Sequence, residues 1–392
     1  MSLTERPVHG PDVEPNLFAV EEVLPARLFD EITEVRIHRP GVIEQEARRR
    51  KKRTALTRDG KLVLAALDHP ARGVTQVGKD ALAMGNRHQL LARARRVLDD
   101  TDLDGVLVTG DQLDELLILS HLERKRSGAS FLDGRVLVGS MNRGGLAGTV
   151  FEMDDTFTSL TAQRLKELRC EGGKVLFRLD PRDAASGRTL LACADAVNDL
   201  HRHRLAAFVE PLAVERRENG YHNLKDAVSM IRLCGVAAGL GASSAHVWLK
   251  MPYGEGFSDV GRATTLPILM LGGPARESPA EILKDFADGL AASPRIRGAI
   301  IGRNLLFPSS GDPLIRRTPP APRWPMGRAC RHGPTWPDAP AASARRRLAG
   351  KSCLPACSDS ANRRASFCRA GQGRQRGVKV VGLRRRHFAQ SR

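Results

Sequence analysis

The chain has 392 residues and a formal net charge of +18, with 62 Lys and Arg against 44 Asp and Glu. Such a charge suggests nucleic-acid or anionic-membrane binding, but its distribution argues against both for most of the chain. Residues 313–392 hold 19 basic and 2 acidic side chains, which leaves 43 and 42 in residues 1–312. The body is therefore an almost neutral chain of ordinary globular composition, and the basic character belongs to a C-terminal tail.

The body carries no sequence signal for secretion or membrane insertion. Its start, MSLTERPVHGPDVEPN, is polar, and no apolar run approaches the roughly 18 residues of a membrane-spanning helix. Its cysteines, Cys170, Cys193 and Cys234, are dispersed without a CxxC pair. We therefore expect reduced thiols in a cytoplasmic protein.

Residues 1–55 are predicted to form a leader that contains a helix within residues 24–53. This helix ends in RRRKKR at residues 48–53. Such a run can be a localisation signal or a phosphate-binding patch, but we favour a solvated face of the helix.

From Lys61 onward, short apolar stretches alternate with amphipathic stretches of helical period. The first, KLVLAALDHPARG, places Leu62, Leu64, Ala66 and Asp68 on one face of a strand. The eight expected strands lie within residues 61–73, 104–112, 134–145, 172–181, 205–212, 245–251, 265–273 and 297–307. Helices are expected at residues 87–99, 113–122, 189–202, 224–240 and 279–292, and TVFEMDDTF is given no fixed strand limits.

Eight strand-then-helix units over residues 54–312 match the usual length of about 250 residues for a (β/α)8 barrel, an α/β fold. A doubly wound open sheet is the alternative. It is disfavoured because strand after strand ends in a polar residue or glycine, as a closed ring of loops requires: Asp68, Asp111, Arg178, Glu210, Lys250, Gly272 and Gly302. We predict a leader (residues 1–55), a barrel domain (56–312) and a basic tail (313–392).

The sixth expected strand lies in AHVWLKMPYGEGF, where His246, Trp248 and Lys250 share one face at a period of two. If that face fills the barrel, Lys250 is its last inward residue, at the C-terminal mouth where barrel enzymes hold their chemistry. Burial lowers the pKa of a lysine, and the free amine can then attack a carbonyl group. The alternative is a lysine that ends the strand and points into water.

Glycines follow the seventh and eighth strands, in LGGPARES and IGRN. Loops at these positions of a barrel commonly hold a phosphate through bare backbone N–H groups. Gly272, Gly273 and Gly302 would admit a close approach, and Arg303 would add a forked donor. Alternatively, these glycines only shape the turns.

From about Lys61 to Phe307 the sequence resembles the class I aldolase superfamily, which includes deoxyribose-phosphate, tagatose-bisphosphate and bacterial or archaeal fructose-bisphosphate aldolases. LDHPARG resembles the first-strand Asp-His-Gly pattern of the fructose-bisphosphate enzymes. KVLFRLDP, FVEPL and VWLKMP resemble the fourth, fifth and sixth strands of the tagatose-bisphosphate enzymes, which carry a Lys, a Glu and the Schiff-base Lys. LDHPARG, GSMNRGGLAG and FEMDD also resemble an actinobacterial subgroup often labelled deoxyribose-phosphate aldolase-like.

The resemblance implies a carbon–carbon lyase without cofactor or metal that acts on a phosphorylated sugar or sugar acid. Carried over position by position, it implies Lys250 as the Schiff-base nucleophile, surrounded by Glu210, Lys174 and Asp68. Glu210 or Asp68 would then move protons. Lys174 and Arg178 would keep Lys250 deprotonated or hold a substrate oxygen. In the alternatives, Glu210 pairs structurally with Lys174, and Asp68 caps the following helix.

Two departures argue against strict deoxyribose-phosphate chemistry: PILMLGG lacks the second, seventh-strand lysine, and VWLKMPYGEG differs from KTSTG. A metal-dependent aldolase is a second hypothesis, disfavoured because the chain shows no HxxxH or CxxC spacing. The expected partner is a small sugar-phosphate substrate and not a membrane, and homo-oligomer formation is left open.

The tail, residues 313–392, is rich in Arg, Pro, Ala, Ser and Gly and shows no sustained helical or strand period. One interpretation is a basic disordered arm that binds RNA or DNA, although no RNA-binding aromatic motif accompanies it. We favour a shifted reading frame in a GC-rich gene, which produces such a mixture. In that case the helix that closes the barrel is lost, and the chain as written has little activity.

Overall fold

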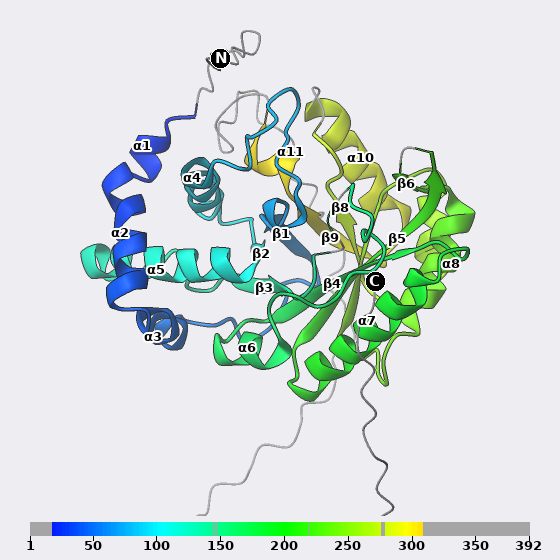
Figure 1. The fold of residues 1–392 in the computed structure, drawn as a ribbon, viewed down its shortest axis with the longest axis horizontal. Helices are drawn as coiled ribbons and strands as arrows, with labels where there is room; N and C mark the ends of the chain where they lie inside the picture. The colour runs from blue at the N-terminus through cyan, green and yellow to red at the C-terminus, as the bar shows by residue number, and fades with distance from the viewer. Residues whose placement is uncertain (1–17, 144–145, 147, 219, 276–278, 309–392) are drawn as a thin grey trace, which may run out of the picture. The chain divides into compact units, whose positions relative to one another are not determined.

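Eight parallel β-strands close on themselves and form a barrel (Figure 1). The structure, a computed structural model, describes residues 18–143, 146, 148–218, 220–275 and 279–308. Neighbouring strands pair all around the barrel, and β9 pairs with β1. The strands are β1 (Leu62–Ala66), β2 (Gly105–Val108), β3 (Val136–Ser140), β4 (Gly172–Leu179), β5 (Ala206–Arg217), β7 (Val247–Met251), β8 (Ile268–Leu271) and β9 (Ile296–Ile301). The predicted (β/α)8 fold is confirmed, and the open-sheet alternative is wrong.

Helices follow the strands along the chain and cover the outside of the barrel (Figure 1). Those after β1 are α4 (Arg87–Val97), α5 (Gly110–Ser127), α6 (Ala162–Glu167), α7 (Ala185–Arg202), α8 (Ala227–Ala238), α9 (Phe257–Arg262), α10 (Pro279–Ala292) and the four-residue α11 (Arg303–Leu306). Side-chain caps fix several starts: Asn86 accepts a hydrogen bond from the amide of Gln89, and Asp226 accepts one from that of Ser229. None of the described helices has the length and apolar character that a membrane crossing needs.

Inward and outward residues alternate along β7 as the sequence predicts. Trp248 is partly buried and packs against the apolar cluster that fills the barrel. Val247, Leu249 and Met251 belong to the larger cluster between the barrel and its helices. This alternation leaves Lys250 facing inward at the C-terminal end of the strand.

Three helices precede the barrel, where the sequence analysis predicted one: α1 (Val20–Val23), α2 (Ala26–His38) and α3 (Val42–Arg49). α2 and α3 both pack against α5, as Figure 1 shows. Their buried faces include Ile32 and Val35 of α2 and Ile43 of α3.

The basic run RRRKKR is the solvated helix face that we favoured only in part. Arg48 and Arg49 are exposed in the last turn of α3, and Lys51 and Lys52 are exposed beyond it, but Arg50 and Arg53 form ion pairs with the barrel. α3 ends one residue before Arg50, which is 1% exposed. Arg50 Nη1 donates to the carbonyl of Arg135 at 2.7 Å, and its Nη2 lies 3.1 Å from Glu171 Oε1. Arg53 Nη1 pairs with Asp104 Oδ1 at 2.8 Å. These partners directly precede β2, β3 and β4, so the run attaches the leader to the N-terminal end of the barrel.

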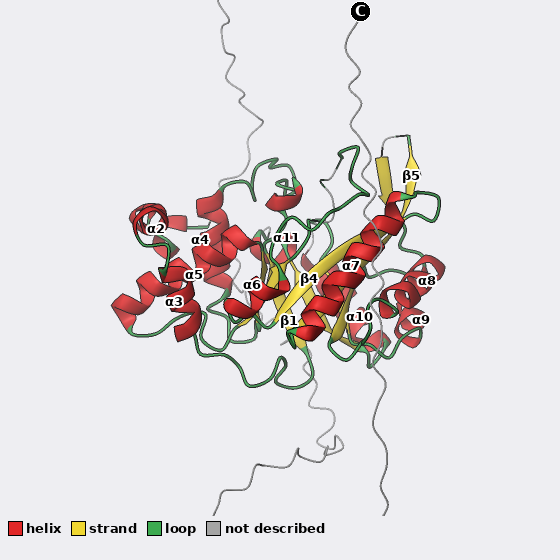
Figure 2. Ribbon diagram, turned by 60° about the horizontal axis from the view of Figure 1, so that its bottom comes forward, coloured by secondary structure: helices red, strands yellow, loops and turns green. Residues whose placement is uncertain are grey.

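Two features are absent from the sequence-based prediction. β5 continues to Arg217 and pairs antiparallel with β6 (Gly220–Asn223), which does not belong to the barrel. Figure 2 shows this hairpin projecting from one end of the barrel. The stretch TVFEMDDTF forms turns and irregular chain instead of a strand.

After β9 the described chain continues to residue 308. Leu306 is fully buried, and its carbonyl accepts a hydrogen bond from Arg93 Nη1 at 2.8 Å. The Arg93 guanidinium also lies 4.5 Å from the ring centroids of Phe18 and Phe307. Backbone proximity divides the chain into Met1–Gly327 and Arg328–Arg392. The predicted basic tail and its effect on barrel closure lie outside the described residues.

Candidate active site

Four charged side chains meet at the C-terminal mouth of the barrel. Lys250 lies on β7, Glu210 on β5, Lys174 on β4, and Asp68 two residues after β1. Each is at most 4% exposed. Lys250 Nζ lies 2.9 Å from Glu210 Oε1, and Lys174 Nζ lies 3.4 Å from Glu210 Oε2 and 2.8 Å from Asp68 Oδ2. The four form a chain of alternating charge, in the order Lys250, Glu210, Lys174, Asp68.

Strand order and the period of two explain this convergence. β5 pairs with β4 on one side and with β7 on the other, because β6 leaves the barrel as a hairpin. Lys174, Glu210 and Lys250 are inward residues of these three neighbouring strands, and their side chains therefore meet. Asp68 does not cap the turn that follows it, because no side chain caps that turn and Asp68 contacts Lys174. The structure thus brings together all four side chains that the resemblance singled out.

Burial and neighbouring charge oppose each other at this cluster. Burial lowers the pKa of Lys250, and this effect prevails over the opposing Glu210 and Asp68 carboxylates. Burial raises the pKa of Glu210, but Lys250 and Lys174 bring it down to about 2. For Asp68, burial is likewise outweighed by Lys174 and Arg72, which hold the pKa of the carboxyl well below its usual range. Both carboxylates are therefore ionised near neutral pH, and Lys250 is a weaker base than an exposed lysine.

His69 adds a neutral imidazole beside the cluster. It is 8% exposed, and its Nδ1 lies 3.8 Å from Asp68 Oδ1. Burial, reinforced by the charge of Arg72, lowers the pKa of His69 to about 3 despite the nearby carboxylate. A Cβ atom on Gly302 would lie 2.2 Å from His69 Cε1, so the glycine is required by the close approach of this ring.

A cavity of about 160 Å³ opens beside Lys250, and we call it the lysine cavity. The residues that line it include Lys250, Glu210, His69, Arg72, Lys225, Gly272, Gly273, Gly302 and Arg303. Glu210 is the single carboxylate of this lining, against four Lys and Arg side chains. The cavity therefore favours an anionic ligand whose reacting carbon reaches Lys250.

Hydrogen bonds join the loop after β8 to the chain after β9. Arg303 Nη2 donates to the carbonyl of Gly273 at 3.3 Å, and Asn304 Nδ2 donates to that of Gly272 at 2.7 Å. The amide of Gly272 donates to the carbonyl of Ile300 at 3.2 Å, so it is not the bare N–H group that we expected. Gly273 has a φ of 65°, a conformation that favours glycine.

Arg178, predicted to add positive field or hold a substrate group, does not line the lysine cavity. Its Nη2 pairs with Glu152 Oε1 at 3.1 Å, in the FEMDD stretch. Burial lowers the pKa of this guanidinium, with Glu152 opposing. Arg72, Lys225 and His69 line the cavity in its place, although the sequence analysis assigned them no role. Little in the sequence pointed to these three residues. Arg72 and His69 follow Asp68 within LDHPARG, where only Asp68 was assigned to the site, and Lys225 lies beyond the expected fifth strand.

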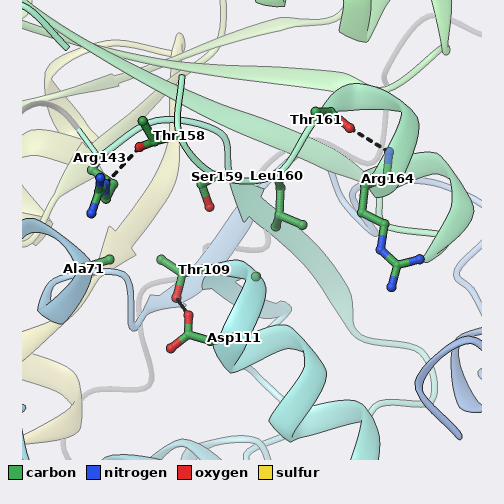
Figure 3. A pocket seen from close by; sticks show the side chains of 10 residues that line it. Ala71, Thr109, Asp111, Arg143, Thr158, Ser159, Leu160, Thr161 and Arg164 are labelled. Carbon is green, nitrogen blue, oxygen red and sulfur yellow. Dashed lines mark hydrogen bonds between the residues drawn. The ribbon is translucent and has the colours of Figure 1, made fainter. Parts of the chain in front are cut away.

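A larger pocket of about 520 Å³ lies between the start of α5 and the segment before α6 (Figure 3). Thr109, Thr158, Ser159 and Thr161 supply hydroxyl groups to it. Arg143 also lines it and donates from Nε to Thr158 Oγ1 at 2.9 Å. The 3-10 turn η1 (Pro70–Arg72) separates the two hollows, because Ala71 lines this pocket and the next residue lines the lysine cavity.

The described residues contain no group of three or more His, Cys, Asp or Glu side chains that could hold a metal ion. His201 and His246 come together, with ring centroids 5.9 Å apart, but no third ligand joins them. The metal-dependent hypothesis therefore has no ligand set in this part of the chain.

The barrel is similar to known proteins. Residues 60–315 match the model of a family described as Cgl0159-like. The crystal structure of Cgl0159 from Corynebacterium glutamicum is 35% identical, with a TM-score of 0.68 over 76% of this chain and 95% of that chain. An archaeal fructose-1,6-bisphosphate aldolase, solved with its catalytic Lys bound to a carbinolamine intermediate, is 18% identical with a TM-score of 0.47 over 69% and 94%. The fructose-bisphosphate aldolase of Slackia heliotrinireducens is 15% identical with a TM-score of 0.45 over 72% and 83%. No curated protein matches the sequence.

Proposed function

The chain belongs to the Cgl0159-like family, and we propose that it is a Schiff-base (class I) aldolase-like lyase that acts on a phosphorylated sugar or sugar acid. One observation carries the proposal: a buried lysine, Lys250, contacts Glu210 at 2.9 Å and faces a cavity at the mouth of a barrel. A desolvated amine next to a proton acceptor is what carbonyl attack requires. The finer assignment to a deoxyribose-phosphate aldolase-like subgroup stays a prediction.

The reaction begins with a proton transfer from the Lys250 ammonium to Glu210. The free amine adds to the carbonyl carbon of the substrate, and the carbinolamine that results loses water to give a protonated imine. The imine draws in the electron pair of the bond between its α and β carbons, which gives an enamine, and the far fragment leaves as an aldehyde when the proton of its β-hydroxyl is removed. Protonation of the enamine and hydrolysis of the imine release the second product and restore the lysine.

Glu210 is the proton carrier for Lys250, because its carboxylate is the nearest acceptor to Nζ. The proton it takes from the ammonium is returned to the carbinolamine hydroxyl, which leaves as water. Lys174 contacts Glu210 and Asp68 and keeps both carboxylates ionised. Its own charge also disfavours protonation of Lys250. Asp68 is the second candidate base, for the hydroxyl of the leaving fragment.

The phosphate end of the substrate is assigned to Gly272, Gly273, Gly302 and Arg303, on the same cavity as Lys250. Gly273 lets the ligand approach the backbone, Gly302 makes room for the His69 ring beside it, and Arg303 offers a forked donor. Arg178 is left out of this assignment because Glu152 holds its guanidinium.

Borohydride trapping tests the proposal. The full chain is incubated with deoxyribose phosphate, ketose bisphosphates or a phosphorylated keto acid, then reduced and digested. We expect the substrate mass on the peptide that spans residues 248–253. An adduct on Lys174, or none with any carbonyl compound, would contradict the assignment of the nucleophile. Cleavage that EDTA abolishes, without any adduct, would favour a metal-dependent aldolase instead.

A further inference from the structure

The lysine cavity holds more positive charge than the proposed covalent chemistry uses. The two lysines of the buried cluster are balanced by its two carboxylates, but Arg72, Lys225 and Arg303 remain. None of these three has an ion-pair partner among the described residues. We propose that Arg72 and Arg303 clamp a single phosphate-monoester dianion between them, which makes Arg72 a specificity-determining residue. This inference rests on the proposed function, because the clamp would hold the phosphate end of the lyase substrate.

Arg72 is placed at the cavity by the short turn η1. Its amide donates to the carbonyl of His69 at 2.9 Å, and Gly73 ends the turn with a φ of 74°. The Nε atom of Arg72 is buried and has no hydrogen-bond partner among the described residues. A buried guanidinium donor without an acceptor costs free energy, and an anion in the cavity would supply that acceptor.

Arg303 approaches the same space from the neighbouring strand. β9 pairs with β1, so the residues that follow these two strands are neighbours around the mouth. Arg303 Nη2 donates to the carbonyl of Gly273, which fixes its direction, while its Nε is buried without a hydrogen-bond partner in the described chain. Burial, and after it the charge of Arg72, lowers the pKa of Arg303. The two guanidiniums therefore repel each other when no anion lies between them.

The chemistry of this pair favours phosphate over carboxylate. A phosphate monoester carries about −1.5 to −2 charges at pH 7 and three terminal oxygens, enough to neutralise two guanidiniums and accept from both forks. A carboxylate carries one charge and can serve one fork. Lys225 is exposed, so water already solvates its charge and it needs no anion.

Arg143 provides a matched control because its guanidinium lies in the other pocket (Figure 3). It too has no ion-pair partner among the described residues, but a carboxylate, Asp111, lines its pocket, and the second arginine there, Arg164, pairs with Glu44 at 2.6 Å. The Arg143 pocket therefore lacks the excess of two unpaired guanidiniums that defines the clamp.

The test measures binding and does not depend on turnover. Inorganic phosphate is titrated by calorimetry into the full chain and into Arg72→Gln, Arg303→Gln and Arg143→Gln, with acetate as a second probe. Loss of a charged hydrogen bond predicts phosphate affinity about tenfold lower in each clamp variant and unchanged in Arg143→Gln. Circular dichroism verifies that each variant folds. If Arg72→Gln does not fold, Arg72→Lys, which keeps the charge without the fork, takes its place.

Phosphate binding by Arg72→Gln as tight as by the parent chain would overturn the proposal. Weaker acetate binding with unchanged phosphate binding in Arg72→Gln would show that Arg72 binds a carboxylate. This result would also overturn the proposal. Borohydride trapping of Lys250 with an unphosphorylated aldehyde tests the proposed function without the phosphate site, so the two proposals can fail separately. If Lys250 is still trapped in a chain that fails the phosphate test, the clamp is wrong and the lyase assignment stands.

Discussion

Lys250 Nζ and Glu210 Oε1 lie 2.9 Å apart, and both residues are 4% exposed. Burial favours the neutral amine of the lysine, whereas the carboxylate favours the ammonium. The contact therefore provides the acceptor for the proton that must leave before the amine can attack. Its effect on the lysine can be measured by changing either partner.

Replacing Lys250 with Arg should keep the fold and abolish turnover. The guanidinium preserves the charge beside Glu210 but stays protonated, so it cannot form an imine. We expect kcat to fall by roughly 10³–10⁶-fold, as when a nucleophile is removed. Steady-state cleavage and borohydride trapping measure this loss. Lys284→Arg is the matched control, because the Lys284 side chain is 76% exposed on α10; an equal loss there would contradict a specific role for Lys250.

Glu210→Gln should separate imine formation from proton transfer. Glu210 raises the pKa of Lys250 against the effect of burial, so without the carboxylate the lysine pKa should fall further. Trapping should then persist at lower pH than in the parent chain, while turnover drops by about 10²–10⁴-fold through loss of the proton carrier. pH profiles of trapping and of kcat give the two readouts. A trapping profile that moves to higher pH would show that Glu210 does not act on the lysine in this way, and Glu215→Gln on the hairpin should change neither profile.

The position of Lys250 could be predicted from the sequence because it depends on local alternation in one strand. Arg50 could not, because its burial depends on the carbonyl of Arg135 and the carboxylate of Glu171, far along the chain. Arg178 is a similar case. The strand period of two placed it on the inward face, but its partner, Glu152, lies in a stretch without periodicity. Arg72 looked like an ordinary turn residue. Its place in the cavity follows from the closure of β9 onto β1, which no local pattern encodes.

His69 should make the stability of the fold depend on pH in the mildly acidic range. Its pKa is lowered from 6.5 to about 3 by burial and by Arg72. Between these values only the unfolded chain binds the proton, so the free energy of unfolding should fall as pH drops from 6.5 toward 3. The slope is at most about 1.4 kcal/mol per pH unit. Urea denaturation at several pH values should show that His69→Gln flattens this slope.

His38 is the control for that series, since its side chain is 68% exposed. We expect His38→Gln to keep the slope of the parent chain. An unaltered slope in His69→Gln would mean that other groups cause the acid sensitivity. Glu210 adds a second loss of stability as pH falls from 4.5 toward its folded-state pKa of about 2, so above pH 4.5 the slope reports His69 without this contribution.

Gly273 and Gly302 should respond differently to a bulky side chain. A Cβ atom on Gly273 would meet open space, but the backbone there is left-handed, so Gly273→Val disturbs the phosphate loop alone. We expect KM to rise more for phosphorylated than for unphosphorylated substrates. In Gly302→Val the new side chain would displace His69 and should lower kcat for both classes. Equal changes in KM for both classes in Gly273→Val would indicate that this glycine only shapes the backbone.

The segment after β9 decides whether a helix covers the last strand of the closed barrel. A (β/α)8 barrel covers its first and last strands with a helix at this point, and the described helix there, α11, has four residues. The next residues read PSSGDPLIRRTPPAPRWP. Each proline costs about 3 kcal/mol inside a helix, so we expect no closing helix in this stretch. The similarity to the family ends at residue 315, close to the same point.

A shifted reading frame accounts for this switch and predicts a rescue. Each apolar side chain left uncovered lowers the free energy of unfolding by roughly 1.5–3 kcal/mol. A few such losses equal the whole free energy of unfolding of a typical protein, about 5–15 kcal/mol. The 392-residue chain should therefore be poorly soluble and weakly active. Restoring the alternative frame just after the codon for Asp312 should encode an amphipathic helix rich in Ala, Val and Leu, and both the solubility of the chain and the yield of trapping at Lys250 should rise. The nucleotide sequence decides the matter: if neither other frame encodes a helical pattern there, the frameshift hypothesis is wrong. Salt-dependent RNA binding by residues 313–392 would then be the property to measure.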